Sequence, residues 1–281
     1  MAVTDPGVRL DRDGPVATVT LCRPHVLNAQ TPAMWAALRG YGRDLPGDVR
    51  VVVVRGEGRA FSAGLDLSAL SASSGQDDTA PGHAAPDDGA RSAPAAGTAE
   101  TFSFADLAGS DDGVAERVIA GFQEAFSWLR RPDLVSVAAV RGHAIGAGFQ
   151  LALACDLRVL ADNAQFTMAE VSLGLVPDLG GTKRLLELVG YARALEICVL
   201  GRRIGAAEAD RLGLATSVVP SDDLEKAVAE LTAQLLAAPR DAVVEVKALL
   251  AAAAGRDFPA QEAAERAAQL RRIRDLVGRG D

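Results

Sequence analysis

Two glycine-rich turns and one carboxylate are the residues of this chain whose types and spacing could do chemistry. Residues 142–150 (GHAIGAGFQ) place a Gly/Ala-rich turn at the start of an apolar helix, and Glu170 follows in the same segment. A helix N-terminus carries unpaired backbone N–H groups and the positive end of the helix dipole, so it can hold an oxyanion. An oxyanion site with a carboxylate base nearby predicts chemistry that passes through an enolate.

A second small-residue turn and a second acid belong to the same hypothesis. Residues 60–67 (AFSAGLDL) follow an expected strand, and their Ala63-Gly64 pair permits close approach of the backbone to a ligand. Asp178 lies eight residues beyond Glu170, either as a catalytic partner or as the N-cap of the helix expected near Gly181. For Glu170 the alternative to a base is a solvated acid or a member of an ion pair.

The elements that must position these residues form a β/α core. Thr31 and Pro32 have the N-cap and first-turn chemistry of a helix over 32–45, which lies between β-branched runs expected as strands. Expected strands span 16–22, 49–55, 135–140, 156–160 and 215–219. Expected helices span 32–45, 146–154, 182–189, 192–200, 206–212, 222–238, 242–254 and 259–276.

Composition divides the chain into a core, an insertion and a helical tail. We expect the core over 1–200 and a C-terminal helical region over 201–281. Within 71–112, 35 of 42 residues are Ala, Gly, Ser, Thr, Pro or Asp, a composition that predicts a flexible insertion. The insertion is either inert or a lid over the site, with Phe102, Phe104 and Leu107 as its docking groups.

Charge, cysteines and hydropathy exclude several classes of function. The net charge is −8, but residues 71–112 hold eight acids and one base, so the folded body is nearly neutral and no basic stripe predicts a nucleic-acid partner. No apolar run reaches the roughly 20 residues of a membrane span, and the N-terminus lacks signal-peptide features, so we expect a cytoplasmic protein. Cys22, Cys155 and Cys198 are expected to be reduced, buried thiols, and no Cys/His spacing predicts a metal site.

Five segments together resemble the enoyl-CoA hydratase/isomerase, or crotonase, superfamily. They are 23–28 (RPHVLN), 60–67, 142–150, 166–181 and 201–215 (GRRIGAAEADRLGLA), within a match over residues 8–70 and 113–250. The resemblance implies an α/β crotonase (ClpP-like) fold, a spiral of ββα units with a C-terminal helical trimerisation region. It also implies an acyl-CoA thioester substrate, no cofactor beyond the coenzyme A of that substrate, and a homotrimer or dimer of trimers. The helical region is shorter than is usual for the family.

The resemblance also assigns roles to individual residues. The backbone N–H groups of Leu65 and Ala147 would form the oxyanion hole for the thioester oxygen. The substrate and its CoA arm would contact Ala63, Gly64, Leu65, Asp66, Leu67 and Gln150. Hydratases of the family use two glutamates, which here correspond to Gln150 and Glu170, and Asp178 resembles the acid of dienoyl-CoA isomerases and ring-epoxide isomerases.

The glutamine decides among the candidate reactions. Gln150 cannot take or give a proton at neutral pH, and hydration of an alkene is served best by two carboxylates. Shifting a double bond needs one base, so we expect conversion of 3-enoyl-CoA to 2-enoyl-CoA with Glu170 as the catalytic base and Asp178 as a further catalytic candidate. The alternatives are an enoyl-CoA hydratase and a non-catalytic acyl-CoA binding protein.

Overall fold

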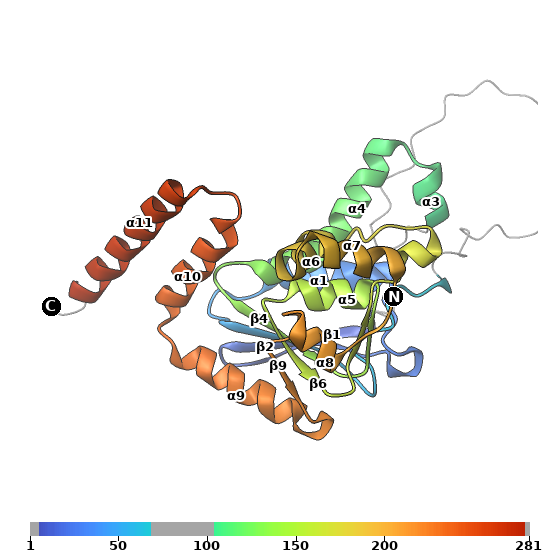
Figure 1. Cartoon of the computed structure of the whole chain (residues 1–281), viewed down its shortest axis with the longest axis horizontal. Helices are drawn as coiled ribbons and strands as arrows, with labels where there is room; N and C mark the ends of the chain where they lie inside the picture. The colour runs from blue at the N-terminus through green and yellow to red at the C-terminus, as the bar shows by residue number, and fades with distance from the viewer. Residues whose placement is uncertain (1–5, 69–103, 279–281) are drawn as a thin grey trace, which may run out of the picture.

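A six-stranded sheet forms the centre of the molecule (Figure 1). The computed structural model describes residues 6–68 and 104–278. The strand order is β1-β2-β3-β4-β6-β9, with β1 antiparallel to β2 and every other neighbouring pair parallel. These strands span Val8–Asp13, Val16–Leu21, Val51–Gly56, Val135–Val140, Leu157–Ala161 and Ser217–Val219.

Alternation of side chains along these strands builds two apolar cores. In β3, Val52 and Val54 join the larger cluster with helices α1, α4 and α5, whereas Val51 and Val53 join a smaller cluster beneath helix α9. Because successive side chains in a strand point to opposite faces, a strand covered by helices on both faces is apolar throughout. This explains the unbroken valine run of β3.

The helices cover both faces of the sheet and continue beyond it. They are α1 (Pro32–Asp44), α3 (Phe104–Gly109), α4 (Asp112–Ser127), α5 (Ala147–Ala154), α6 (Gly181–Val189), α7 (Tyr191–Leu200), α8 (Ala206–Arg211), α9 (Leu224–Ala237), α10 (Arg240–Ala253) and α11 (Phe258–Val277). The Thr31 side chain accepts a hydrogen bond from Met34 N at 3.2 Å, which confirms the predicted cap of α1.

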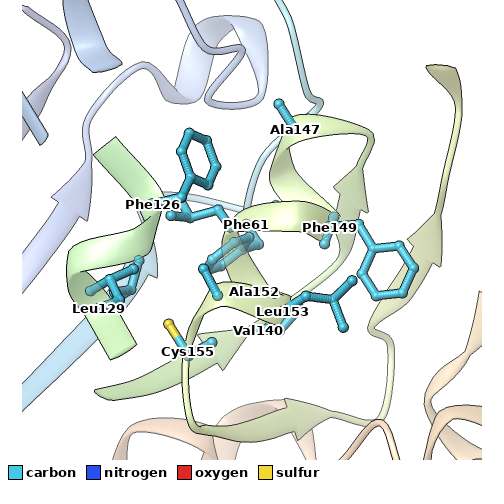
Figure 2. Packing of buried hydrophobic residues seen from close by; sticks show 14 of the residues in the cluster. Phe61, Phe126, Leu129, Val140, Ala147, Phe149, Ala152, Leu153 and Cys155 are labelled. Atoms are coloured by element: carbon cyan, nitrogen blue, oxygen red, sulfur yellow. The ribbon is translucent and has the colours of Figure 1, made fainter. Parts of the chain in front are cut away.

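Helix α5 runs through the larger core. All eight of its residues are buried, and Figure 2 shows Phe149, Ala152 and Leu153 of this helix among Phe61 and Phe126 from other segments. The Phe149 ring stacks on Phe166 at a centroid distance of 4.5 Å. A helix buried on all sides is held rigidly, so its N-terminus is a fixed point in the structure.

A small second sheet lies beside the N-terminus of α5. It consists of β5 (His143–Ile145), β7 (Gln165–Thr167) and β8 (Ile204–Gly205), with β5 parallel to β7 and β7 antiparallel to β8. The predicted strands and helices of the core are all present, whereas these three strands and β1 were not predicted from the sequence. Each strand of the small sheet has three residues or fewer, too few to display an alternating pattern.

The predicted flexible insertion over 71–112 is wrong at its C-terminal end. Residues 104–109 form α3, and α4 begins at Asp112, where the Asp111 side chain caps it by accepting from Gly113 N at 3.0 Å. Leu107 packs against the larger core. Residues 71–103, including the expected docking group Phe102, lie outside the described residues.

Helices α10 and α11 form a hairpin beside the sheet (Figure 1). The Lys247 ammonium of α10 donates to the Asp156 carboxylate at 2.6 Å and to the Leu134 carbonyl at 2.7 Å, which ties this hairpin to the core. No helix in the ranges 6–68 and 104–278 is long and apolar enough to cross a membrane.

Candidate active site

A cavity of about 620 Å³ opens between the two glycine-rich turns and helices α1, α3 and α4. Its polar part is lined by the predicted residues Ala63, Gly64, Leu65, Leu67, Ala147, Gln150, Glu170 and Asp178. Tertiary structure therefore brings together residues that lie more than 100 positions apart in the sequence. Asp66, which was also predicted to contact the substrate, is not among the residues that line the cavity.

The turn of residues 60–67, which is the first of the two turns along the chain, forms an isolated parallel bridge with strand β5. Ser62 N donates to His143 O, and Ile145 N donates to Ser62 O, each at 2.9 Å. On its other side, the turn forms a parallel bridge with Gln30, in which Gln30 N donates to Gly64 O and Asp66 N donates to Gln30 O. In such a bridge the N–H of the residue between the two bonds, Leu65, points away from the partner strand.

Gly64 permits the two turns to meet. Its φ is +88°, and a Cβ at this position would lie 2.6 Å from the Ile145 carbonyl oxygen and 3.7 Å from the Ala147 nitrogen. Only glycine fits here without displacing the backbone. The N–H of Leu65 and the N–H of Ala147 donate to no other group within the part of the chain that the structure describes.

Ala147 is the first residue of α5, so its N–H has no acceptor within the helix. Its N-cap, Gly146, has a φ of +50° and caps the helix without a side chain. The dipole of the buried helix α5 adds positive potential at the same place. Leu65 and Ala147 therefore place two N–H groups beside one cavity, and their role as an oxyanion hole stays a prediction.

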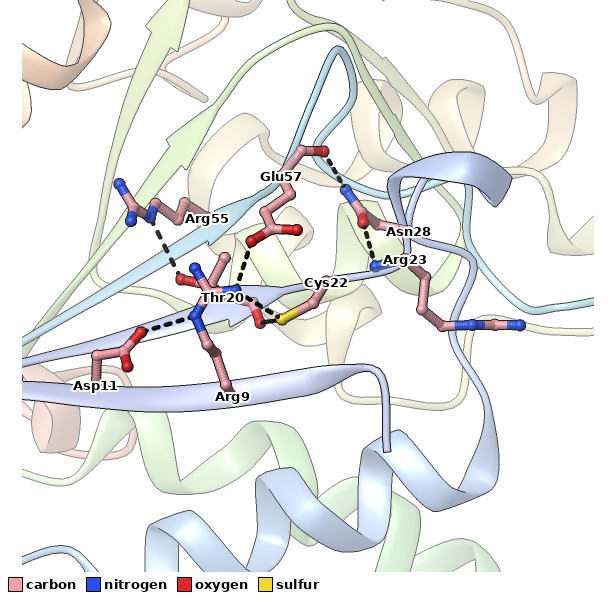
Figure 3. A network of polar contacts seen from close by, with 8 residues as sticks. All are labelled: Arg9, Asp11, Thr20, Cys22, Arg23, Asn28, Arg55 and Glu57. Atoms are coloured by element: carbon pink, nitrogen blue, oxygen red, sulfur yellow. Dashed lines mark hydrogen bonds and ion pairs between the residues drawn. The ribbon is translucent and has the colours of Figure 1, made fainter. Parts of the chain in front are cut away.

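The RPHVLN segment braces the first turn. Asn28 is fully buried with a φ of +57°, and its amide donates to the carbonyl oxygens of Glu57 and Ala60, each at 2.9 Å, while accepting from Arg23 N (Figure 3). Ser62 Oγ donates to Asn28 O at 2.8 Å. This bracing role was not predicted from the sequence, although asparagine's tolerance of left-handed backbone is a signal for it.

Asp66 has a bracing role in this structure. Its carboxylate accepts from Ser68 and from Arg23 Nη1 at 2.9 Å, and these hydrogen bonds lower its pKa, with Ser68 as the largest cause. Arg23 Nη1 also donates to Ala29 O at 2.7 Å. The expected contact of Asp66 with the CoA arm stays a prediction.

Glu170 begins the 3-10 helix Glu170–Leu173, and its carboxylate lies beside Gly146 in the turn of residues 142–150. Its Oε1 is 3.3 Å from the position of a Cβ on Gly146 and accepts from Gln150 Nε2 at 2.7 Å. Its Oε2 is buried and has no hydrogen-bond partner among the residues that the structure describes. Burial raises the pKa of Glu170, the Gln150 amide lowers it, and the nearby Asp178 raises it slightly. A desolvated carboxylate with one free oxygen is suited to accept a proton from a ligand.

Gln150 fixes the orientation of this carboxylate. Its Oε1 accepts from Leu179 N at 2.9 Å and from Gly181 N at 3.3 Å, near the N-terminus of α6. These two donors leave only the NH₂ group to face Glu170, so the amide presents a donor to the carboxylate. Gln150 is 1% exposed, and its expected contact with the substrate stays a prediction.

Asp178 lines the same cavity as Glu170. Burial raises the pKa of its carboxyl group, and its carbonyl oxygen accepts from Gln123 Nε2 at 2.7 Å. The predicted alternative, that Asp178 caps the following helix, is wrong. The N-cap residue of α6 is Gly180, and no side chain caps this helix. Two carboxyl groups with raised pKa values therefore face one cavity.

The apolar part of the cavity was not foreseen, except for Leu107 as a docking group. It is formed by Trp35 of α1, Leu107 and Ala108 of α3, and Ala115, Ile119 and Phe122 of α4. The positions of the last three, i, i+4 and i+7, lie on one face of a helix, and this pattern was readable in the sequence. No group of three or more His, Cys, Asp or Glu side chains that could hold a metal ion occurs in residues 6–68 and 104–278.

Comparison with known proteins places these features in a family context. The family model for enoyl-CoA hydratase/isomerase matches residues 97–275. An enoyl-CoA hydratase of Mycobacterium tuberculosis (strain CDC 1551 / Oshkosh), named "probable enoyl-CoA hydratase echA8", is 30% identical over 219 residues, covering 77% of this chain and 70% of the relative. Carnitinyl-CoA dehydratase of Salmonella typhimurium is 34% identical over 260 residues, covering 91% and 83% respectively.

Solved structures share the whole fold. A protein of Thermobifida fusca YX, named "putative enoyl-CoA hydratase", is 46% identical in its complex with acetoacetyl-CoA, with a TM-score of 0.83 and coverage of 96% of both chains. Its complex with CoA has a TM-score of 0.82 and covers 97% of this chain and 95% of that chain.

Proposed function

Because this chain belongs to the enoyl-CoA hydratase/isomerase family and has its crotonase fold, we propose that it moves a double bond in an acyl-CoA thioester, from 3-enoyl-CoA to 2-enoyl-CoA. The family supports an acyl-CoA processing enzyme, and the Thermobifida structures with bound CoA and acetoacetyl-CoA support a CoA thioester in the cavity. The choice of isomerisation over hydration rests on this chain's own residues.

The proposed reaction uses one base and one oxyanion hole. The thioester oxygen accepts from the N–H groups of Leu65 and Ala147, which makes the C2 protons acidic. Glu170 Oε2 takes a proton from C2, and the electron pair of that C–H bond moves into a dienolate whose negative charge lies on the thioester oxygen. Glu170 returns the proton at C4, the new double bond forms between C2 and C3, and the CoA thioester is carried into the product unchanged, with no other cofactor involved.

The buried amide of Gln150 is the observation that carries the proposal. It occupies the position that corresponds to the first glutamate of the family's hydratases, and it donates to Glu170 at 2.7 Å. An amide cannot deliver or remove a proton, so it cannot activate a water molecule for addition to the alkene. It does stabilise the ionised form of Glu170, which is the form that a base requires.

The test compares two substrates with the purified protein. We expect 3-hexenoyl-CoA to gain the absorbance of a conjugated thioester without a change in mass, and 2-hexenoyl-CoA not to gain the mass of water. Glu170→Gln should lower kcat/KM by about 10² to 10⁴-fold, the usual contribution of a general base, while affinity for CoA stays within about twofold. An unchanged isomerisation rate in Glu170→Gln would exclude Glu170 as the base.

Hydration of 2-enoyl-CoA is the second candidate, and Asp178 is the observation that favours it. With Glu170 it supplies a second carboxyl group facing the cavity, and the relatives are named hydratase or dehydratase. A 3-hydroxyacyl product from 2-hexenoyl-CoA that Asp178→Asn abolishes would establish this reaction. Tight binding of acyl-CoA without turnover of either substrate would instead indicate a binding protein.

We also propose that the chain assembles as a homotrimer or a dimer of trimers, as the family resemblance implies. Support comes from the exposed apolar side chains of α10 and α11, namely Val246, Leu250, Leu270, Ile273 and Leu276. Sedimentation equilibrium of the purified chain measures the assembly, and a monomer at micromolar concentration would contradict it.

A further inference from the structure

The cavity separates into a reacting end and an apolar end. Among the described residues that line it, the only ionisable side chains are Glu170 and Asp178, and the Asp178 carbonyl oxygen accepts from Gln123 of α4. The apolar end is lined from α1, α3 and α4 by carbon atoms of aliphatic and aromatic side chains. A ligand that extends from the oxyanion hole past Glu170 and Asp178 into this end meets no further charged group among the described lining residues.

The innermost part of this wall is rigid and has its polar atom paired. Trp35 and Phe122 are 4% and 5% exposed, and their rings contact each other with centroids 4.9 Å apart. The Trp35 indole N–H donates to Gln30 Oε1 at 2.7 Å. The described residues of this wall consequently offer no hydrogen bond to a hydroxyl or amide on a ligand, and a polar acyl group would lose its hydration here without compensation.

The space along helix α4 is wider at one end of the helix than at the other. Ala115, Ile119 and Phe122 lie along one face of this helix, whereas Glu116 and Ala120 are exposed on other faces. The side chain is large at Phe122 and small at Ala115, so the space beside the helix widens toward its N-terminal turn. Leu107 and Ala108 of α3 border the same space.

The size of the cavity sets the length of chain that it holds. At about 30 Å³ for each water-sized group, 620 Å³ has room for about 20 non-hydrogen atoms. The thioester and the adjoining end of the CoA arm take about eight of these, which leaves about 12 for the acyl chain. A four-carbon acyl group would leave most of the apolar wall exposed to water.

We propose that the cavity selects an apolar acyl group of medium length, about eight to twelve carbons, which lies along the Ala115–Ile119–Phe122 face of α4. The proposal rests on the assignment of this cavity to acyl-CoA in the proposed function. It adds which acyl group is taken and names Ala115 as the residue that sets the length. Each buried methylene should strengthen binding about fourfold, so octanoyl-CoA, with four more methylenes, should bind about 250-fold more tightly than butanoyl-CoA.

The test uses saturated thioesters, because they have no double bond to shift or hydrate. Calorimetric titration of the purified full-length protein with CoA, butanoyl-CoA, hexanoyl-CoA, octanoyl-CoA and decanoyl-CoA gives the affinity at each length. Ala115→Trp fills the space beside α4 and should weaken decanoyl-CoA binding at least about tenfold, with butanoyl-CoA changed less than about twofold. The matched control is Ala120→Trp, on an exposed face of the same helix, which should leave the whole series unchanged.

The outcomes separate this inference from the isomerase proposal. Equal affinities from butanoyl-CoA to decanoyl-CoA, or an equal loss at every length in Ala115→Trp with an unchanged melting temperature, would overturn the inference even if 3-hexenoyl-CoA is isomerised. A rising series that Ala115→Trp truncates would support it even if no enoyl-CoA is turned over, in which case only the proposed reaction fails. Thermal melting of both tryptophan variants controls for folding.

Discussion

Replacing Gly64 by alanine tests the oxyanion hole most directly. The added Cβ would lie 2.6 Å from the Ile145 carbonyl oxygen, where an ordinary carbon–oxygen contact needs at least about 3.2 Å. The turn must therefore retreat by about 0.6 Å or more. A residue other than glycine at a φ of +88° adds about 1 to 2 kcal/mol of backbone strain.

This displacement acts on the reaction through the neighbouring Leu65 N–H. A shift of about 1 Å in a catalytic group can cost about 100-fold in rate, and loss of one oxyanion donor costs about 10² to 10³-fold. We expect kcat/KM for 3-hexenoyl-CoA to fall about 100-fold in Gly64→Ala, mainly through kcat. Because Ala147 N–H and Glu170 are unchanged, some activity should remain.

The assay is the steady-state rate of conjugation, with Gly14→Ala as the matched control. Gly14 also has a positive φ, +53°, but a Cβ there would meet nothing within 4 Å. The control therefore carries a similar backbone strain without a displaced site. If Gly64→Ala keeps wild-type kcat while its melting temperature matches that of the control, the assignment of Leu65 N–H to the oxyanion hole is wrong.

Three further outcomes are expected. Since burial raises the pKa of Glu170, kcat/KM should fall with decreasing pH through a midpoint above the ordinary range of a glutamate, because only the ionised form is a base; a midpoint in the ordinary range would contradict the buried-base assignment. Gln150→Glu keeps the acceptor for Leu179 N and, when protonated, still donates to Glu170, so the isomerisation rate at neutral pH should stay within about tenfold and a 3-hydroxyacyl product should appear. Two carboxyl oxygens about 2.7 Å apart cannot both ionise readily, so this hydration activity should be lost as pH rises. No hydration at any pH would show that the scaffold cannot position water. Lys247→Met removes the cation that pairs with Asp156 and should lower the free energy of unfolding, measured by urea titration, by about 1 to 3 kcal/mol. This is less than for a fully buried pair, because both side chains are partly exposed. The double variant with Asp156→Asn should recover part of the loss, and an unchanged free energy of unfolding in Lys247→Met would show that this ion pair does not stabilise the fold.

Local patterns in the sequence were sufficient for much of the core. The valine-rich strands β2, β3 and β4 and the Thr31–Pro32 start of α1 have preferences that depend on neighbouring residues only. The same holds for the two glycine turns, because a positive φ or a close backbone approach requires glycine at that position itself. The predicted oxyanion donors and the base consequently line one cavity in the structure.

Composition misled where tertiary contacts outweigh it. The small, polar residues before Asp112 predict a flexible segment, yet α3 forms and Leu107 packs on the core. Strands β5, β7 and β8 have three residues or fewer, which is too short for an alternating sequence pattern. They are stabilised by pairing with one another and with the turn of residues 60–67. Their pairing depends on partners distant in the sequence.

The sequence by itself determined which residues are able to do chemistry, because the carboxyl group of Glu170, the amide of Gln150 and the freedom of Gly64 are properties of single residues. Tertiary structure alone decided what each of them does. The Gln150 amide faces Glu170 as a donor only because Leu179 N and Gly181 N, about 30 positions later, occupy its oxygen. The apolar wall likewise exists only because α1, α3 and α4 meet at one cavity. Burial of Glu170 at the other end of this cavity, which is absent in the unfolded chain, raises the pKa of its carboxyl group.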